Sequence, residues 1–366
     1  MPYTQQQTVF VLSMLSNLAI TQTGSANRLE QYLGAHVDAH LQASADDIGV
    51  WTRVWGPAVF QAAPLSNVAD NVMYVACNTA TPPQYVVAIA GTNYNSAFDV
   101  LIEDFYVGKQ VPWEYGHPPP GAAISAGTFA GLTILQFLTP GPGMPGGNQR
   151  LDDFFKTVVT QPIQIVVSGH SLGGALSPAI ALWLLDTQPA WDLQTRATIS
   201  CEPTAGPTAG NAAFARYYDQ SLGSRTTRIW NRLDIVPHAW NQTDLSEVPA
   251  LYNPAVPPDV VIDALVAAAE SAASDGRYTQ INAATAALDG TLNTSLLDPK
   301  RWAFENYLVQ AGYQHVDEYF TLLQVTIGAE AMQAVRTAMG VPAAQRAAAR
   351  LRAQLERRGA IPAAMR

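Results

Sequence analysis

The motif Gly169-His170-Ser171-Leu172-Gly173-Gly174 constrains the fold of this chain more than any other feature. It follows the β-branched run IQIVVS and precedes the apolar, helix-like run ALSPAIALWLL. A tight strand-to-helix turn needs small residues on either side of its centre and leaves a central serine hydroxyl clear of the sheet edge. The pattern therefore predicts a nucleophile elbow at Ser171, and it favours this over a glycine-rich helix cap.

The rest of the chain alternates between strand and helix patterns, as expected for an α/β sheet with helices on both faces. An early antiparallel hairpin would make the sheet mixed at one edge and mostly parallel elsewhere. Strands are predicted over residues 72–77, 85–90, 163–168, 196–201 and 225–231. Helices are predicted over residues 4–20, 26–45, 128–138, 150–160 and 172–186, with a Pro/Gly-rich surface loop over 139–148.

Two further segments extend this scaffold. Residues 258–290 are rich in alanine and are expected to be helical, within an insertion at about 241–300. Residues 329–358 have the pattern of two basic amphipathic helices, broken at Gly340 and Pro342. We therefore expect one α/β domain over residues 1–327 and a basic helical tail over 328–366.

Charge and composition narrow the function. The net charge of −9 argues against nucleic-acid binding, although residues 328–366 carry seven arginines and two glutamates. Charged residues make up 13% of the chain, against about 25% in an ordinary globular protein. An apolar surface is consistent with a neutral or oily substrate, although a general compositional bias would give the same low charge.

The sequence gives weaker indications about cellular context. The two cysteines, Cys77 and Cys201, could form one disulfide bond or none. The apolar run from Val9 to Ile20 is expected to be an amphipathic helix, since it lacks a basic flank and a clear cleavage site. Secretion and a cytoplasmic location both stay open. No run is long enough for a transmembrane helix. No Cys/His cluster has zinc-like spacing, and neither a metal nor an organic cofactor is expected.

A nucleophilic serine needs a histidine as base and a carboxylate to orient that histidine. In hydrolases of this architecture the order along the chain is serine, acid, histidine, which leaves His238 and His315 as candidate bases. Asp234 follows the predicted strand 225–231 and has apolar neighbours, so it is the predicted acid. His238 lies only four residues beyond Asp234. His315, expected in a loop, is therefore the preferred base, with His238 as the alternative.

Four segments in this order resemble the fungal-type class 3 triacylglycerol lipases of the α/β-hydrolase superfamily. They are GHSLGGA, GNAAFARY, NRLDIVPH and QHVDEYF, and the resemblance extends from about Val72 to about Phe320. It implies the same roles for Ser171, Asp234 and His315. The chain departs from the family in its long connections between residues 92 and 171 and between 234 and 315, in its few cysteines and in its basic tail.

The resemblance also implies an oxyanion hole and a lid. The backbone N–H groups of Leu172 and Thr92 are the expected oxyanion donors, since Thr92 ends the strand element Ala90-Gly91-Thr92. The expected lid helix is Ser96–Val107, and its apolar face carries Phe98, Leu101, Ile102 and Phe105. A fixed surface helix is the alternative for this segment.

These features together predict a triacylglycerol lipase that contacts a lipid interface transiently. A carboxylesterase or a phospholipase A1-type enzyme acting on other esters is the alternative within the same chemistry. An inactive hydrolase fold that serves as a binding protein is the alternative of another class.

Overall fold

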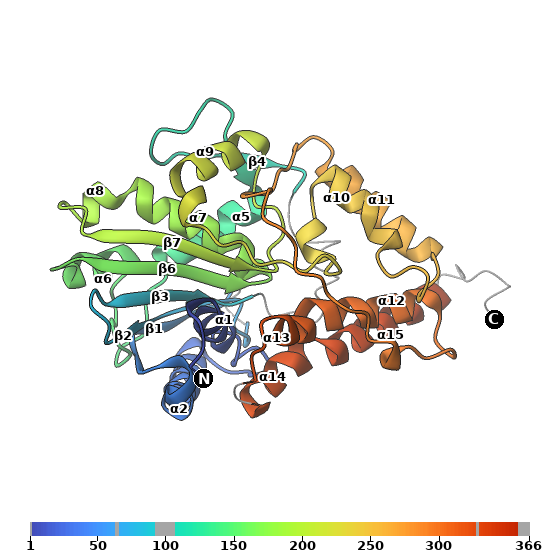
Figure 1. The fold of residues 1–366 in the computed structure, drawn as a ribbon, viewed down its shortest axis with the longest axis horizontal. Helices are drawn as coiled ribbons and strands as arrows, with labels where there is room; N and C mark the ends of the chain where they lie inside the picture. Colours follow the sequence, from blue (N-terminus) through green and yellow to red (C-terminus); the bar gives the residue numbers. More distant parts are fainter. Residues whose placement is uncertain (1, 63–65, 92–106, 327–328, 358–366) are drawn as a thin grey trace.

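The structure, a computed structural model, describes residues 2–62, 66–91, 107–326 and 329–357. At its centre is a five-stranded sheet with the strand order β1-β2-β3-β6-β7 (Figure 1). The strands are β1 (Trp51–Phe60), β2 (Asn71–Asn78), β3 (Gln84–Ile89), β6 (Ile163–His170) and β7 (Ala197–Thr204). The first three pair antiparallel, whereas β3, β6 and β7 pair parallel. The predicted mixed α/β sheet is confirmed.

Side chains alternate between the two faces of the sheet, so that each face has its own core. Tyr74 of β2 and Val86 of β3 face the helices α1 (Gln5–Leu15) and α2 (Ala26–Ala43). Met73 and Val87, one residue away along the same strands, face the other layer. That layer contains α5 (Ala126–Phe137), α6 (Leu151–Val158), α7 (Leu172–Asp186) and α9 (Ala212–Leu222).

Helix α1 differs from the predicted amphipathic helix because it is buried on every side. All residues from Thr8 to Leu15 are buried, between the sheet and the later helix α14 (Ala329–Met339). The Phe10 ring packs edge-on against Phe320, with 5.2 Å between the ring centroids. A helix that is apolar all round belongs in the interior of a protein, and this location explains the run from Val9 to Ile20.

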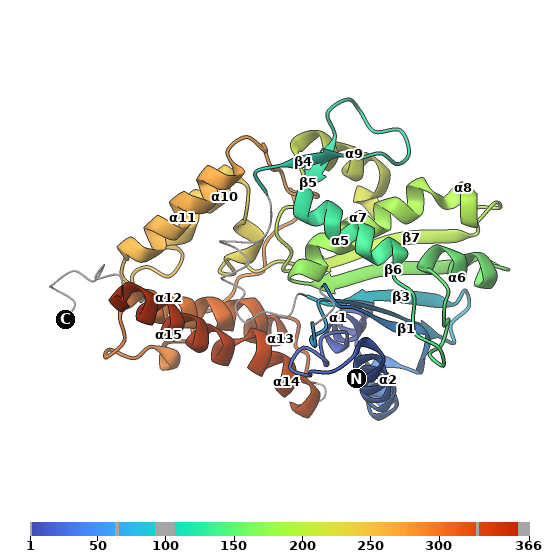
Figure 2. The ribbon, with the colours of Figure 1, turned by 180° about the vertical axis from the view of Figure 1, so that it is seen from behind.

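A third apolar cluster lies beside the sheet, in a lobe made from the second half of the chain (Figures 1 and 2). Its helices are α10 (Gln242–Glu247), α11 (Val260–Ala273), α12 (Ala303–Gly312) and α15 (Val341–Arg357). Helix α11 accounts for the first half of the alanine-rich segment, but residues 274–290 are not helical, so the helix prediction was wrong there.

The predicted helix pair near the end of the chain is present as α14 and α15, which are separated by Gly340. Helix α15 packs along α12 and α14. The division into a domain over 1–327 and a tail over 328–366 stays a prediction. The smaller elements are α3 (Ala45–Ile48), β4 (Gln110–Pro112), β5 (Ala123–Ser125), α8 (Gln188–Trp191) and α13 (Glu318–Leu322).

Three other details differ from the sequence predictions or complete them. The predicted strand 225–231 is absent and is replaced by three isolated parallel bridges, Cys201 to Thr226, Thr204 to Ile229 and Asn231 to Leu288. Strand β1 was not predicted. Both cysteines, Cys77 and Cys201, are free thiols. In the described part of the chain, no helix combines the length and the apolar character needed to cross a bilayer.

Candidate active site

Ser171 lies in the sharp turn between β6, which ends at His170, and α7, which begins at Leu172. Its backbone has φ 62° and ψ −122°, a conformation that residues other than glycine rarely adopt. Such backbone strain persists only where the surrounding structure enforces it. Here the Ser171 N–H donates to the Thr204 carbonyl oxygen at 3.1 Å, which ties the turn to β7.

The glycines around Ser171 are required by close contacts with neighbouring backbone. A Cβ atom on Gly173 would lie 2.3 Å from the Ile89 carbonyl oxygen, and one on Gly174 would lie 2.3 Å from that of Thr204. A Cβ atom on Gly169 would lie 2.5 Å from the Gly173 carbonyl oxygen. The spacing of the motif therefore follows from how closely α7 approaches β3, β6 and β7.

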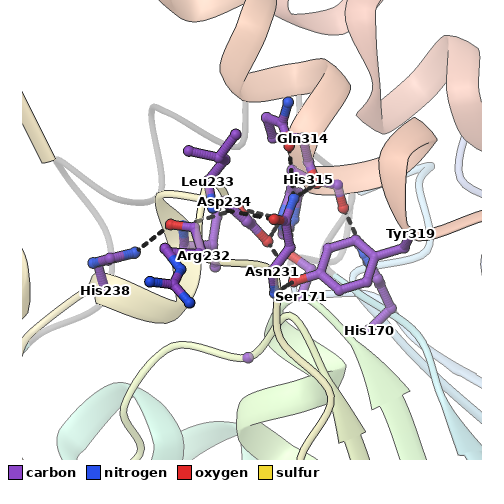
Figure 3. A network of polar contacts seen from close by, with 12 residues as sticks. His170, Ser171, Asn231, Arg232, Leu233, Asp234, His238, Gln314, His315 and Tyr319 are labelled. Carbon is purple, nitrogen blue, oxygen red and sulfur yellow. Dashed lines mark hydrogen bonds and ion pairs between the residues drawn. The ribbon is translucent and has the colours of Figure 1, made fainter. Parts of the chain in front are cut away.

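The structure brings Ser171, His315 and Asp234 together in one buried row (Figure 3). His315 Nε2 lies 2.9 Å from Ser171 Oγ. On the other side of the ring, His315 Nδ1 lies 2.9 Å from Asp234 Oδ2 and 3.1 Å from Oδ1. The exposed fractions of the three residues are 1%, 2% and 0%, so water does not compete for these hydrogen bonds.

The alternative base, His238, is held away from the serine. Its Nε2 lies 3.0 Å from the Arg232 carbonyl oxygen, and its Nδ1 lies 3.3 Å from that of Asp244. Figure 3 shows the His238 ring on the far side of the turn that carries Asp234. Of the two histidines that the sequence left open, His315 is the one in contact with Ser171.

His315 lies in a helical segment and not in the predicted loop. Helix α12 continues into a π-helical turn, η6 (Tyr313–Asp317), and then into α13. π-Helical turns are rare, have wider hydrogen-bonded loops than an α-helix and occur often at functional sites. The turn directs the His315 ring toward both Ser171 and Asp234 (Figure 3).

Asp234 is fixed by donors that sequence reasoning missed. The Tyr319 hydroxyl donates to Asp234 Oδ2 at 3.0 Å, and the Val236 N–H donates to Oδ1 at 3.1 Å. Burial, followed by the charge of Asp234, raises the pKa of Tyr319 well above its usual value, so the phenol keeps its proton. Tyr319 follows His315 by four residues, the spacing that places two side chains on one helical face. That spacing was the available signal.

Asn231 connects the Asp234 turn to the helix that carries His315. Its side-chain amide donates to Gln314 Oε1 at 2.7 Å, and its backbone N–H donates to the Tyr319 hydroxyl at 2.9 Å. Asn231 is fully buried. No local sequence pattern signals this role, because its partners lie more than 80 residues away.

His170, inside the elbow, contacts both the backbone and the ring of His315. Its Nε2 donates to the His315 carbonyl oxygen at 2.8 Å, and the two ring centroids are 4.7 Å apart. Burial, followed by repulsion from His315, lowers the pKa of His170 well below its usual value. His170 is therefore neutral in the folded protein and positions the backbone of the His315 turn.

The neutral state of His170 predicts a pH-dependent stability. Below about pH 6.5 the unfolded chain binds a proton at this residue and the folded protein does not, so stability falls as the pH falls, by up to about 1.4 kcal/mol per pH unit. The variant His170→Gln keeps a donor but cannot titrate. Between pH 7.5 and pH 5, we expect the wild type to lose about 2 kcal/mol more stability than His170→Gln in urea unfolding. Equal losses would show that His170 accepts a proton in the fold.

The expected oxyanion donors are only partly within the described structure. Leu172 is the first residue of α7, where backbone N–H groups have no partner within the helix. Thr92 and the lid residues Phe98, Leu101, Ile102 and Phe105 lie outside the described residues, as does most of the segment Ser96–Val107. The residue before Thr92 is anchored, because the Gly91 N–H donates to Asn17 Oδ1 at 2.8 Å. The roles of Thr92, Leu172 and the lid stay predictions.

Within the ranges that the structure describes, no group of three or more His, Cys, Asp or Glu side chains could hold a metal ion.

The sheet is mixed, and a nucleophile elbow follows its central parallel strand β6. A buried histidine and aspartate lie beside the elbow. These features define the α/β-hydrolase class. Residues 86–243 match the family model described as "Lipase (class 3)". The crystal structure of M37 lipase superimposes with a TM-score of 0.82, at 36% sequence identity, and covers 92% of this chain and 98% of that one. The chain belongs to the class 3 lipase family.

Lipases from Rhizopus niveus and Rhizopus oryzae are each 34% identical to the chain over 178 residues. The matched region is 47% of this chain and 38% of each of those proteins, so the chain spans less than half the length of these curated relatives.

Proposed function

We propose that this protein hydrolyses carboxylic esters, with triacylglycerols as its main substrates, through an acyl-enzyme on Ser171. The observation that carries the proposal is the continuous hydrogen-bonded row from Ser171 Oγ through the His315 ring to Asp234, at a strained elbow. A serine held in this way, beside a base that is itself oriented by a carboxylate, is an activated nucleophile.

The reaction proceeds in two halves. Ser171 Oγ attacks the ester carbonyl carbon while His315 Nε2 takes the hydroxyl proton, and Asp234 stabilises the imidazolium at Nδ1. The N–H groups of Leu172 and Thr92 hold the oxyanion, and the leaving alcohol takes the proton from His315 as the carbon–oxygen bond breaks. A water molecule, deprotonated by His315, then attacks the acyl-enzyme. The carboxylic acid leaves, and the proton returns to Ser171.

Two observations favour triacylglycerols over other esters. The family model and the similar solved structure are both named as lipases. The low content of charged residues suits contact with an oily surface, in keeping with a transient encounter with a lipid interface. A carboxylesterase or a phospholipase A1-type enzyme would use the same residues on a different substrate.

A substrate series separates these activities. We expect the purified protein to hydrolyse emulsified triolein, and its rate on tributyrin to rise when tributyrin exceeds its solubility, because an interface concentrates the apolar substrate at the protein surface. Titrated fatty acid release measures both rates, and phosphatidylcholine vesicles serve as the comparison. Activity confined to dissolved short-chain esters would assign a carboxylesterase, and faster release from vesicles would assign a phospholipase.

Labelling with a fluorophosphonate probe tests the nucleophile independently of the ester chosen. We expect rapid labelling of wild-type protein at Ser171, since the probe needs only an activated serine. A protein that neither reacts with the probe nor hydrolyses any ester would be the inactive binding protein.

A further inference from the structure

We propose that the helical hairpin α14–α15 is part of the catalytic apparatus, with Arg336 as a positioning residue that holds the His315 turn in place. This inference rests on the proposed function for its catalytic consequence. The hairpin lies well beyond the region matched by the family model, which ends at residue 243. One of its arginines, Arg336, is thereby assigned a role beside the active site, whereas Arg346, Arg350 and Arg357 are exposed.

Arg336 on α14 contacts the segment that carries His315. Its Nε lies 3.2 Å from Asp317 Oδ1, two residues after His315. The same guanidinium lies over the Phe320 ring, with 4.8 Å between its central carbon and the ring centroid. Burial raises the pKa of Asp317, and the charge of Arg336 opposes this rise and favours the carboxylate. The ion pair and the ring contact fix η6 and α13 together.

The hairpin also packs closely against Gly312, the residue that precedes the π-helical turn. A Cβ atom on Gly312 would lie 2.6 Å from Ala344 Cβ and 3.0 Å from the Gly340 carbonyl oxygen. A Cβ atom on Gly340 would lie 2.8 Å from Asp317 Oδ2. A side chain at Gly312 would push the hairpin away from the turn, so this position depends on the absence of a side chain. A side chain at Gly340 would meet the Arg336 carbonyl oxygen within the hairpin and the carboxylate of Asp317.

A π-helical turn benefits from such support because π-helices are rare and occur mostly as single turns inside α-helices. From inside, the turn is held by His170, which donates to the His315 carbonyl oxygen. From outside, Arg336 and Gly340 hold it. The hairpin also reaches the other half of the site, since a Cβ atom on Gly91 would lie 3.0 Å from Met339 Cε. Gly91 precedes the expected oxyanion donor Thr92.

The charged and polar groups around the π-helical turn determine how the loss of Arg336 should change the electrostatic environment of His315. His170 from β6 and Asp234 from the turn after residue 231 face His315, and Arg336 from α14 faces Asp317. In α13, which follows the turn, Glu318 accepts hydrogen bonds from Tyr313 and from the Thr291 N–H, and Tyr319 donates to Asp234. Without Arg336, the carboxylate of Asp317 would lose its cationic partner, which adds an uncompensated negative charge near His315.

Arg336→Gln tests the inference, with Arg352→Gln as the matched control. Arg352 lies in the same hairpin but pairs with Glu305 and Glu356, away from His315.

In Arg336→Gln we expect faster amide exchange by mass spectrometry in peptides covering residues 312–320, and kcat lower by about tenfold with KM unchanged, because small displacements of a reacting group are costly. The acidic limb of kcat/KM should move to higher pH, since an uncompensated anion favours the imidazolium. Arg336→Lys should restore that limb.

The exchange readout does not depend on activity, so it separates this inference from the proposed function. If the wild type hydrolyses no ester, the proposed function fails, while the exchange data still decide whether the hairpin holds the turn. Equal exchange over residues 312–320 in Arg336→Gln and Arg352→Gln would overturn the inference. So would equal losses of kcat without any shift in the acidic limb.

A second pair of variants tests the close contact between Gly312 and the hairpin. Gly312→Ala should increase exchange over the same peptides and lower kcat, because the new methyl group meets Ala344. Adding Ala344→Gly removes the opposing methyl group and should recover at least half of the lost kcat. Failure of the double variant to recover, in a protein that folds as well as Gly312→Ala, would contradict a direct contact between hairpin and turn.

Discussion

Replacement of Ser171 by alanine is expected to lower kcat for p-nitrophenyl butyrate by about four to six orders of magnitude. The variant keeps the elbow and the His315–Asp234 pair but loses the atom that would attack the ester. Residual turnover would come from the oxyanion donors and substrate binding alone. Initial rates at high protein concentration measure this loss, and fluorophosphonate labelling should disappear with it.

Ser177→Ala is the matched control for that experiment. Ser177 is buried in the same helix α7 and lies beside Cys201 of β7. We expect it to keep the activity and the labelling of the wild type within a factor of about three. An active, labelled Ser171→Ala protein would show that another residue is the nucleophile.

Replacement of Asp234 by asparagine is expected to lower kcat by about four orders of magnitude at neutral pH. The change keeps the size of the side chain, but an amide has one acceptor oxygen where the carboxylate has two. Asp234 accepts from His315 Nδ1, from the Tyr319 hydroxyl and from the Val236 N–H. An amide NH2 directed at His315 would favour the tautomer with its proton on Nε2, which cannot take the proton of Ser171.

Asp244→Asn provides the comparison, since Asp244 is a partly buried aspartate near the alternative base His238. We expect it to be nearly as active as the wild type. Pre-steady-state rates of acyl-enzyme formation would place the loss in Asp234→Asn on proton removal from Ser171. Comparable activity of the two variants would remove Asp234 from the proposed mechanism.

The sequence was sufficient for the features that depend on local pattern. The elbow at Ser171 follows from glycines whose spacing reflects close backbone contacts. The hairpin of β2 and β3 follows from two β-branched runs separated by a proline-containing loop. Asp234 and His315 were found because the chain order of the three residues leaves few candidates.

The sequence failed where neighbours distant in the chain decide the structure. Strand β1 contains Gly56 and Pro57 and two register irregularities, which hide its strand pattern. Residues 225–231 look like a strand, but they form only isolated bridges at the edge of the sheet beyond β7. The π-helical turn at His315 and the supporting role of Asn231 exist only because separate segments meet. No pattern of spacing within one segment encodes such a meeting.

Complete burial of α1 requires α14, which lies far from it in the sequence. One side of this helix is covered by β3, β6 and β7, and another by α14, which is synthesised more than 300 residues after it. Until α14 arrives, a run of valine, phenylalanine and leucine side chains has no complete cover, and such exposure promotes self-association of nascent chains. Contacts between segments so far apart also slow folding. Production of this protein should therefore respond strongly to chaperone supply and to lowered growth temperature, and shortened chains that lack α14 should accumulate as aggregates.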